Sequence, residues 1–548
     1  MTKKLQHIAL ALVGVLLLNF LSSKVFKRFD VTQDKRYTLS ETSESILDQV
    51  DETVYIDVYL EGEFPAEFQR LQIETRQFLE ELQAKNSEVT FQFVNPDKIR
   101  ERLVKRGMMP SQLTVEEDGK LSEAIIFPWA EINYQDKSKI VSLLPSTKTT
   151  SQEEQLENAV ANLEFSFVDA INSLLQKEQQ KVAVITGNGQ LQDAELYSFL
   201  SEVGQKYRLA KFTLDSVQKN PQKTTKDLQS FDVAIIAKPS EKFSPEEKLT
   251  LDQFITNGGK TLWMLDNIQA DTDSLYNGGK MLAYPRDLQL TDLLFSYGVR
   301  VNNKLVEDLY AAQIPLATGN VGNQPQFQNL DWFYHPLANG NPNHPITKNV
   351  LPSRMRFATS LDTLKNNIKK TPLLMSSVLT KLVGTPKIIS LTSVANEPQQ
   401  NEYKNGNQLF AVLLEGEFNS AYKNRIKPFE GFDFKGTSSP NKMIVVADGD
   451  IGKNQFMKGQ PYDLGVDKWT NQRFGNKDFL LNAVDYLVDD SGLIYLRNKS
   501  VKLPVLDKQR AYKEKKKWQF INIGIPLFLL ALFGFGYTYF RKRKYASM

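Results

Sequence analysis

Two aspartates after an apolar run form the first motif suited to ligand chemistry. Asp448-Gly449-Asp450 follows Ile444–Ala447, whose composition is typical of a buried strand. Two carboxylates at a strand end could hold a divalent cation, which takes several oxygen ligands. The sequence identifies no further ligands, so a turn or a helix cap is the alternative interpretation of Asp448 and Asp450.

A glycine turn between a predicted strand and a predicted helix is the second candidate. Gly187-Asn188-Gly189 follows the apolar residues 181–186 and precedes a helical pattern at 193–206. Ligands of parallel sheets usually bind at the carboxyl ends of the strands, which makes Gly187, Asn188 and Gly189 candidate binding residues. The third glycine of a dinucleotide fingerprint is missing, and a purely conformational role for the glycines is the alternative.

Other motifs fail the tests for catalysis or metal binding. Gly258-Gly259-Lys260-Thr261 resembles the end of a phosphate-binding loop, but Phe254 stands where the first glycine belongs, and the element order is helix, glycines, strand. His335 and His344 both precede proline in a polar stretch and have no metal-ligand spacing. Neither G-x-S-x-G nor H-E-x-x-H occurs. We therefore predict no catalytic residue, no cofactor and no metal.

Composition narrows the class of protein further. The 548 residues include 67 Lys and Arg against 64 Asp and Glu, a net charge of +3, which gives no reason to expect nucleic acid as a partner. The chain has no cysteine, which excludes disulfides, thiolate metal sites and cysteine nucleophiles. With only three histidines, acid–base and zinc chemistry also become less expected.

One apolar stretch lies near each terminus. Residues 8–21 follow Lys3 and Lys4, a pattern shared by signal peptides, but Ser22–Phe26 is a poor cleavage site, which favours an uncleaved anchor. The 21 residues of Phe520–Phe540 carry no charge and predict a transmembrane helix. Two spans place both termini on one side of the membrane. Basic residues flank the second span on both sides, so charge alone does not fix the orientation.

Between the spans, hydrophobic periodicity predicts two folded units. Alternating strands at 54–60, 89–94, 124–134 and 139–144, with helices at 66–85 and 151–178, predict an N-terminal α/β or α+β domain. Apolar strands at 181–186, 232–237, 260–265 and 443–447, with helices at 193–206, 245–257 and 477–487, predict a mostly parallel sheet covered on both faces. The predicted division is an anchor (1–26), the N-terminal domain (27–178), a larger α/β domain (179–500) with an irregular insertion rich in Asn, Gln, Pro and Gly (about 311–370), a basic connector (501–517), a transmembrane helix (518–541) and a basic tail (542–548).

Several stretches distributed over the whole length resemble the GldG family of gliding-motility proteins, auxiliary and so-called substrate-binding components of ABC-type transport systems. They are Asp34–Ser40, Val184–Gly189, Leu251–Phe254, Asn341–Asn349, Leu413–Phe418 and Val446–Asp450.

The resemblance implies a flavodoxin-like domain of the class I glutamine-amidotransferase type, without catalysis. Such enzymes need a cysteine nucleophile, and this chain has none. The resemblance also implies that the body of the protein lies in the periplasm, that its termini lie in the cytoplasm, and that it is located in the cytoplasmic (inner) membrane. The implied partners are a multi-span permease similar to GldF, a cytoplasmic ATPase similar to GldA reached through the permease, and the lipid bilayer, with room for homodimerisation in the complex.

Three functions therefore compete. The leading hypothesis is a non-enzymatic accessory subunit that binds a periplasmic partner and packs on the permease. The second is a structural scaffold that couples the inner membrane to the gliding and secretion machinery. The third is an amidotransferase-like or carbohydrate-active enzyme, which would depend on Asp448 and Asp450.

Overall fold

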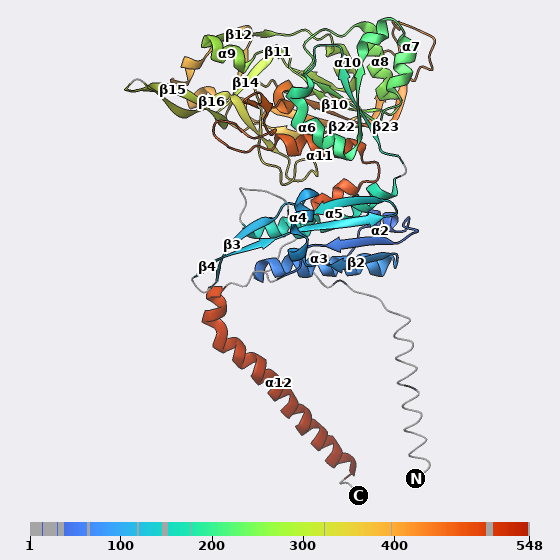
Figure 1. Ribbon diagram of the computed structural model, residues 1–548, viewed down its shortest axis with the longest axis vertical. Helices are drawn as coiled ribbons and strands as arrows, with labels where there is room; N and C mark the ends of the chain where they lie inside the picture. The colour runs from blue at the N-terminus through green and yellow to red at the C-terminus, as the bar shows by residue number, and fades with distance from the viewer. Residues whose placement is uncertain are drawn as a thin grey trace.

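The computed structural model describes residues 14, 30, 38–62, 66–117, 120–144, 152–176, 178–322, 324–395, 397–499 and 508–545. Two α/β domains are stacked along the long axis, and a long helix extends from the end at which the N-terminal domain lies (Figure 1). Apart from Gly14, the predicted anchor at 1–26 lies outside the described residues.

The N-terminal domain is built on a four-stranded sheet in the order β2-β1-β5-β6. Strand β1 pairs in parallel with β2 and antiparallel with β5, which continues into β6. The predicted strand at 124–134 is divided at Phe127 and Pro128 into β4, which belongs to a separate hairpin, and β5. The elements are α2 (Glu41–Leu47), β1 (Val54–Val58), α3 (Ala66–Lys85), β2 (Val89–Phe93), η1 (Pro96–Lys98), α4 (Arg100–Lys105), β3 (Ser111–Glu117), β4 (Lys120–Ile126), β5 (Trp129–Tyr134), β6 (Lys137–Ser142) and α5 (Gln152–Leu175).

The larger domain contains a ten-stranded mixed sheet. Five neighbouring parallel strands, in the order β8-β7-β9-β10-β23, form one half. If these five are numbered along the chain, their spatial order is 2-1-3-4-5. The strands are β7 (Lys181–Thr186), β8 (Arg208–Thr213), β9 (Val233–Ala237), β10 (Lys260–Met264) and β23 (Thr437–Val446).

The other half of the sheet is antiparallel, which corrects the prediction of a mostly parallel sheet. Strand β22 pairs antiparallel with β23, and β19, β16 and β15 extend the sheet in the same manner, while β17 pairs with β16. These strands are β15 (Ala311–Val321), β16 (Gln324–Gly340), β17 (Ser353–Arg354), β19 (Lys369–Met375) and β22 (Leu409–Asn419). The fold is therefore mixed α/β, with several sheets.

Helices cover both faces of the parallel half, because its strands are apolar on both sides. Helices α6 and α11 bury Phe199 and Phe479 on one face, and α8 and α10 bury Phe254 and Tyr297 on the other. Strand β9, between them, is buried at all five positions. This burial explains why unbroken apolar runs predicted the parallel strands correctly. The helices are α6 (Asp193–Lys206), α7 (Pro221–Leu228), α8 (Pro245–Thr256), α10 (Thr291–Tyr297) and α11 (Asn476–Val488).

Short elements complete the larger domain. They are η2 (Leu214–Gln218), β11 (Ile268–Gln269), α9 (Thr272–Gly278), β12 (Lys280–Pro285), β13 (Val299–Val301), β14 (Lys304–Asp308), β18 (Leu361–Thr363), β20 (Thr380–Gly384), β21 (Lys387–Ser390), η3 (Leu391–Ala395), η4 (Gln400–Glu402), η5 (Gly449–Gly452), β24 (Phe456–Met457), β25 (Gln460–Pro461) and η6 (Leu493–Asn498).

The prediction of an irregular insertion at 311–370 is wrong. Strands β15 and β16 form a long hairpin there, and β17, β18 and the start of β19 follow. Polar composition did not prevent strand formation, because apolar residues alternate at the base of the hairpin, where Ile314, Trp332 and Tyr334 are buried. The Asn and Gln residues lie mostly in its exposed part.

The last described helix, α12 (Lys508–Tyr545), contains the one candidate membrane span found among the described residues, Arg510–Lys544. At about 1.5 Å per residue it is about 57 Å long, and a bilayer core of about 30 Å accounts for roughly half of it. None of its most apolar stretch is buried in the protein. The predicted connector is wrong from Lys508 onward, because Lys, Arg, Gln and Glu are good helix formers and extend the span. Residues 501–507 lie outside the described residues.

A buried carboxylate joins two segments that are distant in sequence. Glu164 of α5 is 4% exposed and accepts hydrogen bonds from the Ser40 backbone N–H and the Ser43 hydroxyl, both at 2.7 Å. Lys499 Nζ lies 3.0 Å from the same carboxylate. Although burial alone would raise the pKa of Glu164, Lys499 and the two serine donors lower it below its usual value. Glu164 thus joins the start of the N-terminal domain to the segment that precedes α12.

His344 provides a test of the packing between the 344–350 segment and α11. Its ring lies 5.1 Å from that of Tyr486, and burial lowers its pKa to about 4. The unfolded chain binds a proton near the ordinary histidine pKa, so stability falls as pH drops from about 6.5 towards 4. We expect the native protein to lose about 2 kcal/mol of unfolding free energy between pH 7.5 and 5 through His344. The His344→Gln variant should not show this part of the loss. Urea unfolding of both proteins at these two pH values measures this difference, and parallel pH profiles would contradict it.

Candidate functional site

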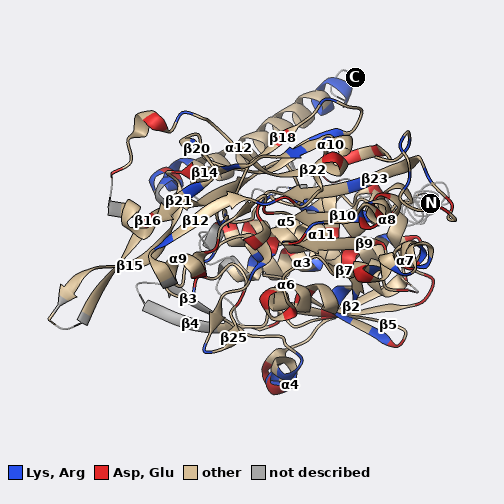
Figure 2. Ribbon diagram, turned by 90° about the horizontal axis from the view of Figure 1, so that it is seen from above, with Lys and Arg blue, Asp and Glu red and all other residues tan. Residues whose placement is uncertain are grey.

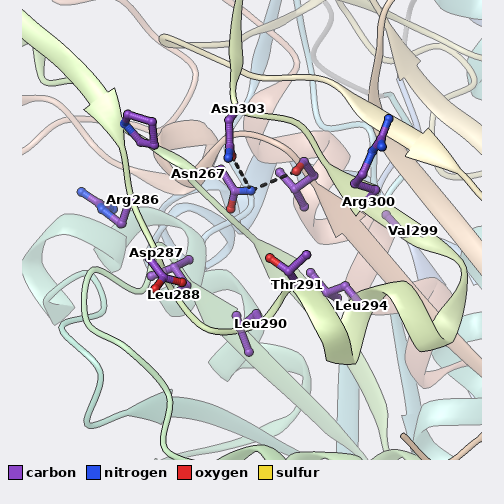
Figure 3. Close-up of a pocket in the computed structure, with 12 residues that line it drawn as sticks. Asn267, Arg286, Asp287, Leu288, Leu290, Thr291, Leu294, Val299, Arg300 and Asn303 are labelled. Atoms are coloured by element: carbon purple, nitrogen blue, oxygen red, sulfur yellow. Dashed lines mark hydrogen bonds between the residues drawn. The ribbon is translucent and has the colours of Figure 1, made fainter. Parts of the chain in front are cut away.

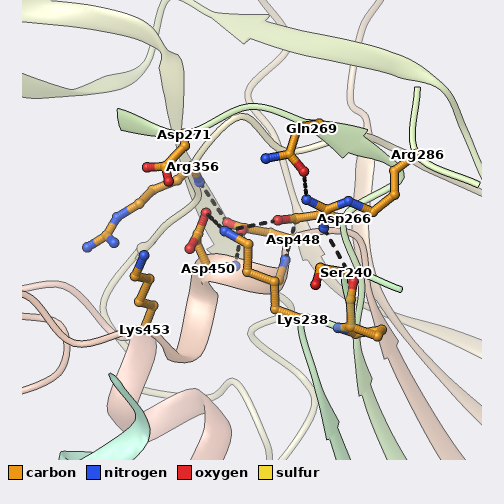
Figure 4. A network of polar contacts seen from close by, with 12 residues as sticks. Lys238, Ser240, Asp266, Gln269, Asp271, Arg286, Arg356, Asp448, Asp450 and Lys453 are labelled. Carbon is orange, nitrogen blue, oxygen red and sulfur yellow. Dashed lines mark hydrogen bonds and ion pairs between the residues drawn. The ribbon is translucent and has the colours of Figure 1, made fainter. Parts of the chain in front are cut away.

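The carboxyl ends of three neighbouring parallel strands bring four charged side chains together (Figure 4). Lys238 follows β9, Asp266 lies two residues after β10, and Asp448 and Asp450 follow β23. Because β9, β10 and β23 are adjacent and parallel, their ends meet at one edge of the sheet. The two predicted aspartates therefore do lie at a polar cluster, together with a lysine and a third aspartate that the sequence analysis did not identify.

The lysine ammonium occupies the centre of the cluster. Lys238 Nζ lies 2.6 Å from Asp450 Oδ2 and 3.4 Å from Asp266 Oδ2. All three side chains are at most 12% exposed. Burial of such charges is costly unless they are paired, and the two carboxylates provide that pairing for the single cation.

Asp448 accepts hydrogen bonds from the backbone. Its carboxylate caps η5 by accepting the Asp450 N–H at 2.8 Å, and it also accepts the Arg356 N–H at 2.7 Å. The Gly449 N–H donates to Asp266 Oδ1 at 2.6 Å. These contacts are those of a helix cap and a turn, the alternative interpretation of Asp448 in the sequence. In contrast to these hydrogen-bonded atoms, Asp450 Oδ1 is buried without a hydrogen-bond partner among the described residues.

The backbone at the cluster is constrained. Lys238 has a φ of +51°, which non-glycine residues rarely adopt and which costs of order 1–3 kcal/mol. A Cβ atom on Gly449 would lie 2.6 Å from Lys238 Cγ, so no larger residue fits without displacing the lysine. The ends of β9 and β23 are thus packed against each other with little room for change.

The ionisation states follow from this arrangement. Burial alone would lower the pKa of Lys238, but Asp450 and Asp266 raise it above its usual value. Burial raises the pKa of Asp448 well above its ordinary value, and the neighbouring carboxylates add to this effect. Burial would also raise the pKa of Asp450, but Lys238 and Arg356 reverse the effect and lower it.

A protonated lysine limits what the cluster can do chemically. Lys238 is cationic at neutral pH and cannot serve there as a base or an amine nucleophile. Its ammonium also lies where a cation would bind between Asp266 and Asp450. Among the described residues, no group of three or more His, Cys, Asp or Glu side chains is arranged to hold a metal ion. The geometry suits the cluster to holding three strand ends in register.

The glycine turn lies at the same edge, beside the end of β9. The Asn188 carbonyl accepts the Ser240 and Glu241 N–H groups at 2.9 and 3.0 Å, and the Asn188 side chain donates to Glu247 at 3.0 Å. Gly187 and Gly189 have φ values of +115° and +64°, and a Cβ on Gly189 would lie 2.1 Å from Ser240 Oγ. The chain's own loop after β9 therefore packs directly on this turn.

A small cavity is lined by Asn267, the residue that follows Asp266 in the chain (Figure 3). It measures about 220 Å³, and Asn267 in its wall donates to the Val301 carbonyl at 3.0 Å and to Asn303 Oδ1 at 3.1 Å. Pockets for drug-sized ligands are usually about 300–1,000 Å³, so this cavity suits at most a small molecule or a few waters. The other lining residues include Arg286, Leu288, Thr291 and Arg300.

A crevice of about 1000 Å³ lies between the domains. It is lined by α2, β6 and α5 on one side and by the ends of α6 and α11 on the other. Lys206 Nζ lies 2.9 Å from Asp485 Oδ2, and the Tyr207 hydroxyl donates to Asp485 Oδ1 at 2.9 Å. Burial raises the pKa of Asp169, which also lines the crevice. Sequence reasoning missed this group because it is assembled from three distant helices.

His335 and His344 do not come together at any of these sites. His335 is buried, and neither ring nitrogen has a hydrogen-bond partner among the described residues, whereas Nδ1 of His344 accepts the Ile346 N–H at 3.3 Å. No metal arrangement brings these two side chains together within the described part of the chain.

Comparison with known proteins identifies the family of this chain. A family model described as "ABC-type uncharacterized transport system" matches residues 179–483, which include the whole cluster. The chain belongs to this family of ABC transport auxiliary proteins. Residues 33–133 of the auxiliary protein match a model for a domain of unknown function. The predicted resemblance is thus confirmed at the level of an ABC transport auxiliary component.

The individual matches name no chemical activity. The auxiliary protein is 22% identical over 448 residues to an uncharacterized protein of Borreliella burgdorferi, a match that covers 80% of each chain. A solved structure, "mmIFT52 N-terminal domain", is 14% identical with a TM-score of 0.32 and covers 57% of this chain and 99% of that one.

Replacement of Lys238 tests the structural role of the cluster. Lys238→Met leaves Asp266 and Asp450 buried and unpaired, so we expect a loss of about 3–5 kcal/mol of unfolding free energy. Lys477→Met is the matched control, because Lys477 pairs with Asp463 at 2.8 Å in a more exposed setting outside the cluster and should cost less than about 1 kcal/mol. Denaturant unfolding measures both variants. Equal losses would contradict the role assigned to Lys238, and adding Asp450→Asn to Lys238→Met should recover part of the loss.

Proposed function

We propose that the protein is a non-enzymatic accessory subunit of an ABC transporter in the cytoplasmic (inner) membrane, of the gliding-motility GldG type. Its body lies in the periplasm, its termini in the cytoplasm, and its spans pack against a multi-span permease that is driven by a separate ATPase. The observation that carries the proposal is the family match over residues 179–483. Helix α12, long and apolar enough to cross a bilayer, supports the membrane location.

We further infer that the parallel half of the larger sheet is flavodoxin-like. The support is its 2-1-3-4-5 strand order, which is the order of that fold. In such sheets the usual ligand site lies outside the carboxyl ends of the strands, at the point where the strand order reverses. Here that point falls between β7 and β9, next to Gly187–Gly189 and Lys238.

The filled strand ends support a binding protein rather than an enzyme. The loop after β9 packs on the glycine turn through Asn188, and Lys238 fills the space between the neighbouring carboxylates. A substrate would have to displace both of these contacts to reach the usual site. An accessory subunit does not need an open site at the strand ends, since its partner binds to the outside of the body.

A scaffold that couples the membrane to gliding machinery is the alternative, and one experiment separates the two. Affinity purification of the full chain in mild detergent should recover a multi-span permease and an ATPase. The reason is that the apolar side chains of α12 are exposed and can pack against the helices of a permease. Removal of residues 508–548 should reduce permease recovery at least tenfold without unfolding the body. If the full chain brings down no permease, the transporter proposal fails and the scaffold remains.

A further inference from the structure

The hairpin of β15 and β16 extends beyond the body as an arm. At its base Ile314 and Trp332 are buried against Leu275 and Met281. Farther out, every side chain that the structure describes between Ala317 and Asn329 is exposed. Phe327, the register partner of Ala317, is 62% exposed. The outer half of the arm is therefore a two-stranded ribbon with solvent on both faces, an arrangement that is only marginally stable in water by itself.

The arm also lacks the charges that normally protect a free strand edge. Strand β15 is the last strand of the sheet, so its outer edge is unpaired within the described chain. Exposed edges are usually blunted by lysines or other charges, but residues 309–330 contain no Lys, Arg, Asp or Glu, in a chain that is 24% charged. Figure 2 shows the described part of the arm without basic or acidic residues. Pro315 alone removes one backbone donor near the base.

We propose that this arm docks against the same arm of a second copy of the chain. A neutral surface gains nothing from an acidic or basic partner, whereas two identical neutral edges meet without the repulsion that like charges cause. The contact would be isologous, with each arm giving the other the strand neighbour it lacks. Pro315 restricts the shared ladder to the part of β15 beyond it.

The placement of the arm favours the second copy over other occupants. The arm leaves the upper domain sideways, while α12 leaves the opposite end of the molecule (Figure 1). Two chains anchored by α12 in one bilayer therefore hold their arms at the same height, where a two-fold axis along the membrane normal can pair them. This step rests on the membrane anchoring in the proposed function, but not on the permease.

The size of the contact sets its strength. A standard interface uses about 20–30 residues on each side. The arm offers about half of that number, so the pair is weak in dilute solution and forms when the membrane concentrates the two chains.

Disulfide cross-linking tests the pairing directly, because the native chain has no cysteine. Single cysteines are placed in turn at Ala317, Asn320, Phe327 and Gln328 in the purified full chain, reconstituted into lipid vesicles without permease. Ile426→Cys is the control for random collision, since Ile426 is 96% exposed in the loop between β22 and β23. We expect at least one arm position to give a cross-linked dimer at ten times the yield of the control.

A charge in the arm should abolish the contact without affecting the fold. Phe327→Glu, added to the best cross-linking variant that keeps Phe327, or to the next best if Phe327→Cys leads, places like charges on the two facing arms. It should lower the dimer yield at least fivefold, with an unchanged thermal unfolding midpoint because Phe327 is exposed. Arm cysteines that cross-link no better than Ile426→Cys, or a yield that Phe327→Glu leaves unchanged, would overturn the proposal. Either result leaves permease co-purification, and with it the proposed function, untouched.

Discussion

The carboxylate of Glu164 holds the start of the N-terminal domain and the segment before α12 on one helix. Ser40, Ser43 and Lys499 all donate to it, and the carboxylate is almost fully buried. Charge-assisted hydrogen bonds of this kind are the strong ones, and removing one partner from a buried pair costs about 3–5 kcal/mol. Apolar packing supports the same contact, because Leu47 and Leu493 of the two segments share one core.

This contact is one of those that hold the two domains in one stacked body. The chain leaves the N-terminal domain through α5, builds the larger domain, and returns through η6, which packs on α5 before α12 begins. The N-terminal domain thus lies between α12 and the larger sheet (Figure 1). A body that is tied back in this way suits a fixed subunit better than a receptor that diffuses away with its ligand. The strand ends around Lys238 agree with that role, since the chain's own side chains fill the space between them.

The sequence predicted those parts of the fold that depend on local pattern. The runs at 181–186, 233–237 and 260–264 are buried strands because both faces of the sheet are covered, and uninterrupted apolar residues mark that situation. The hairpin of β15 and β16 was missed, since its stability comes from pairing between strands and from a few buried residues at its base. At the site, Asp448 and Asp450 were identified from their position after a strand. Lys238 and Asp266 occupy equivalent positions after β9 and β10, and comparison of all the strand ends would have found them.

Hydrogen–deuterium exchange of the full chain tests whether Glu164 ties both end segments to the body. Glu164→Gln keeps the shape of the side chain and removes its charge. We expect the amides of residues 38–50 and 493–499 to exchange at least tenfold faster in Glu164→Gln than in the native chain, while β9 and β10 keep their protection. Unchanged exchange in both segments, or an equal loss of protection throughout the protein, would contradict it.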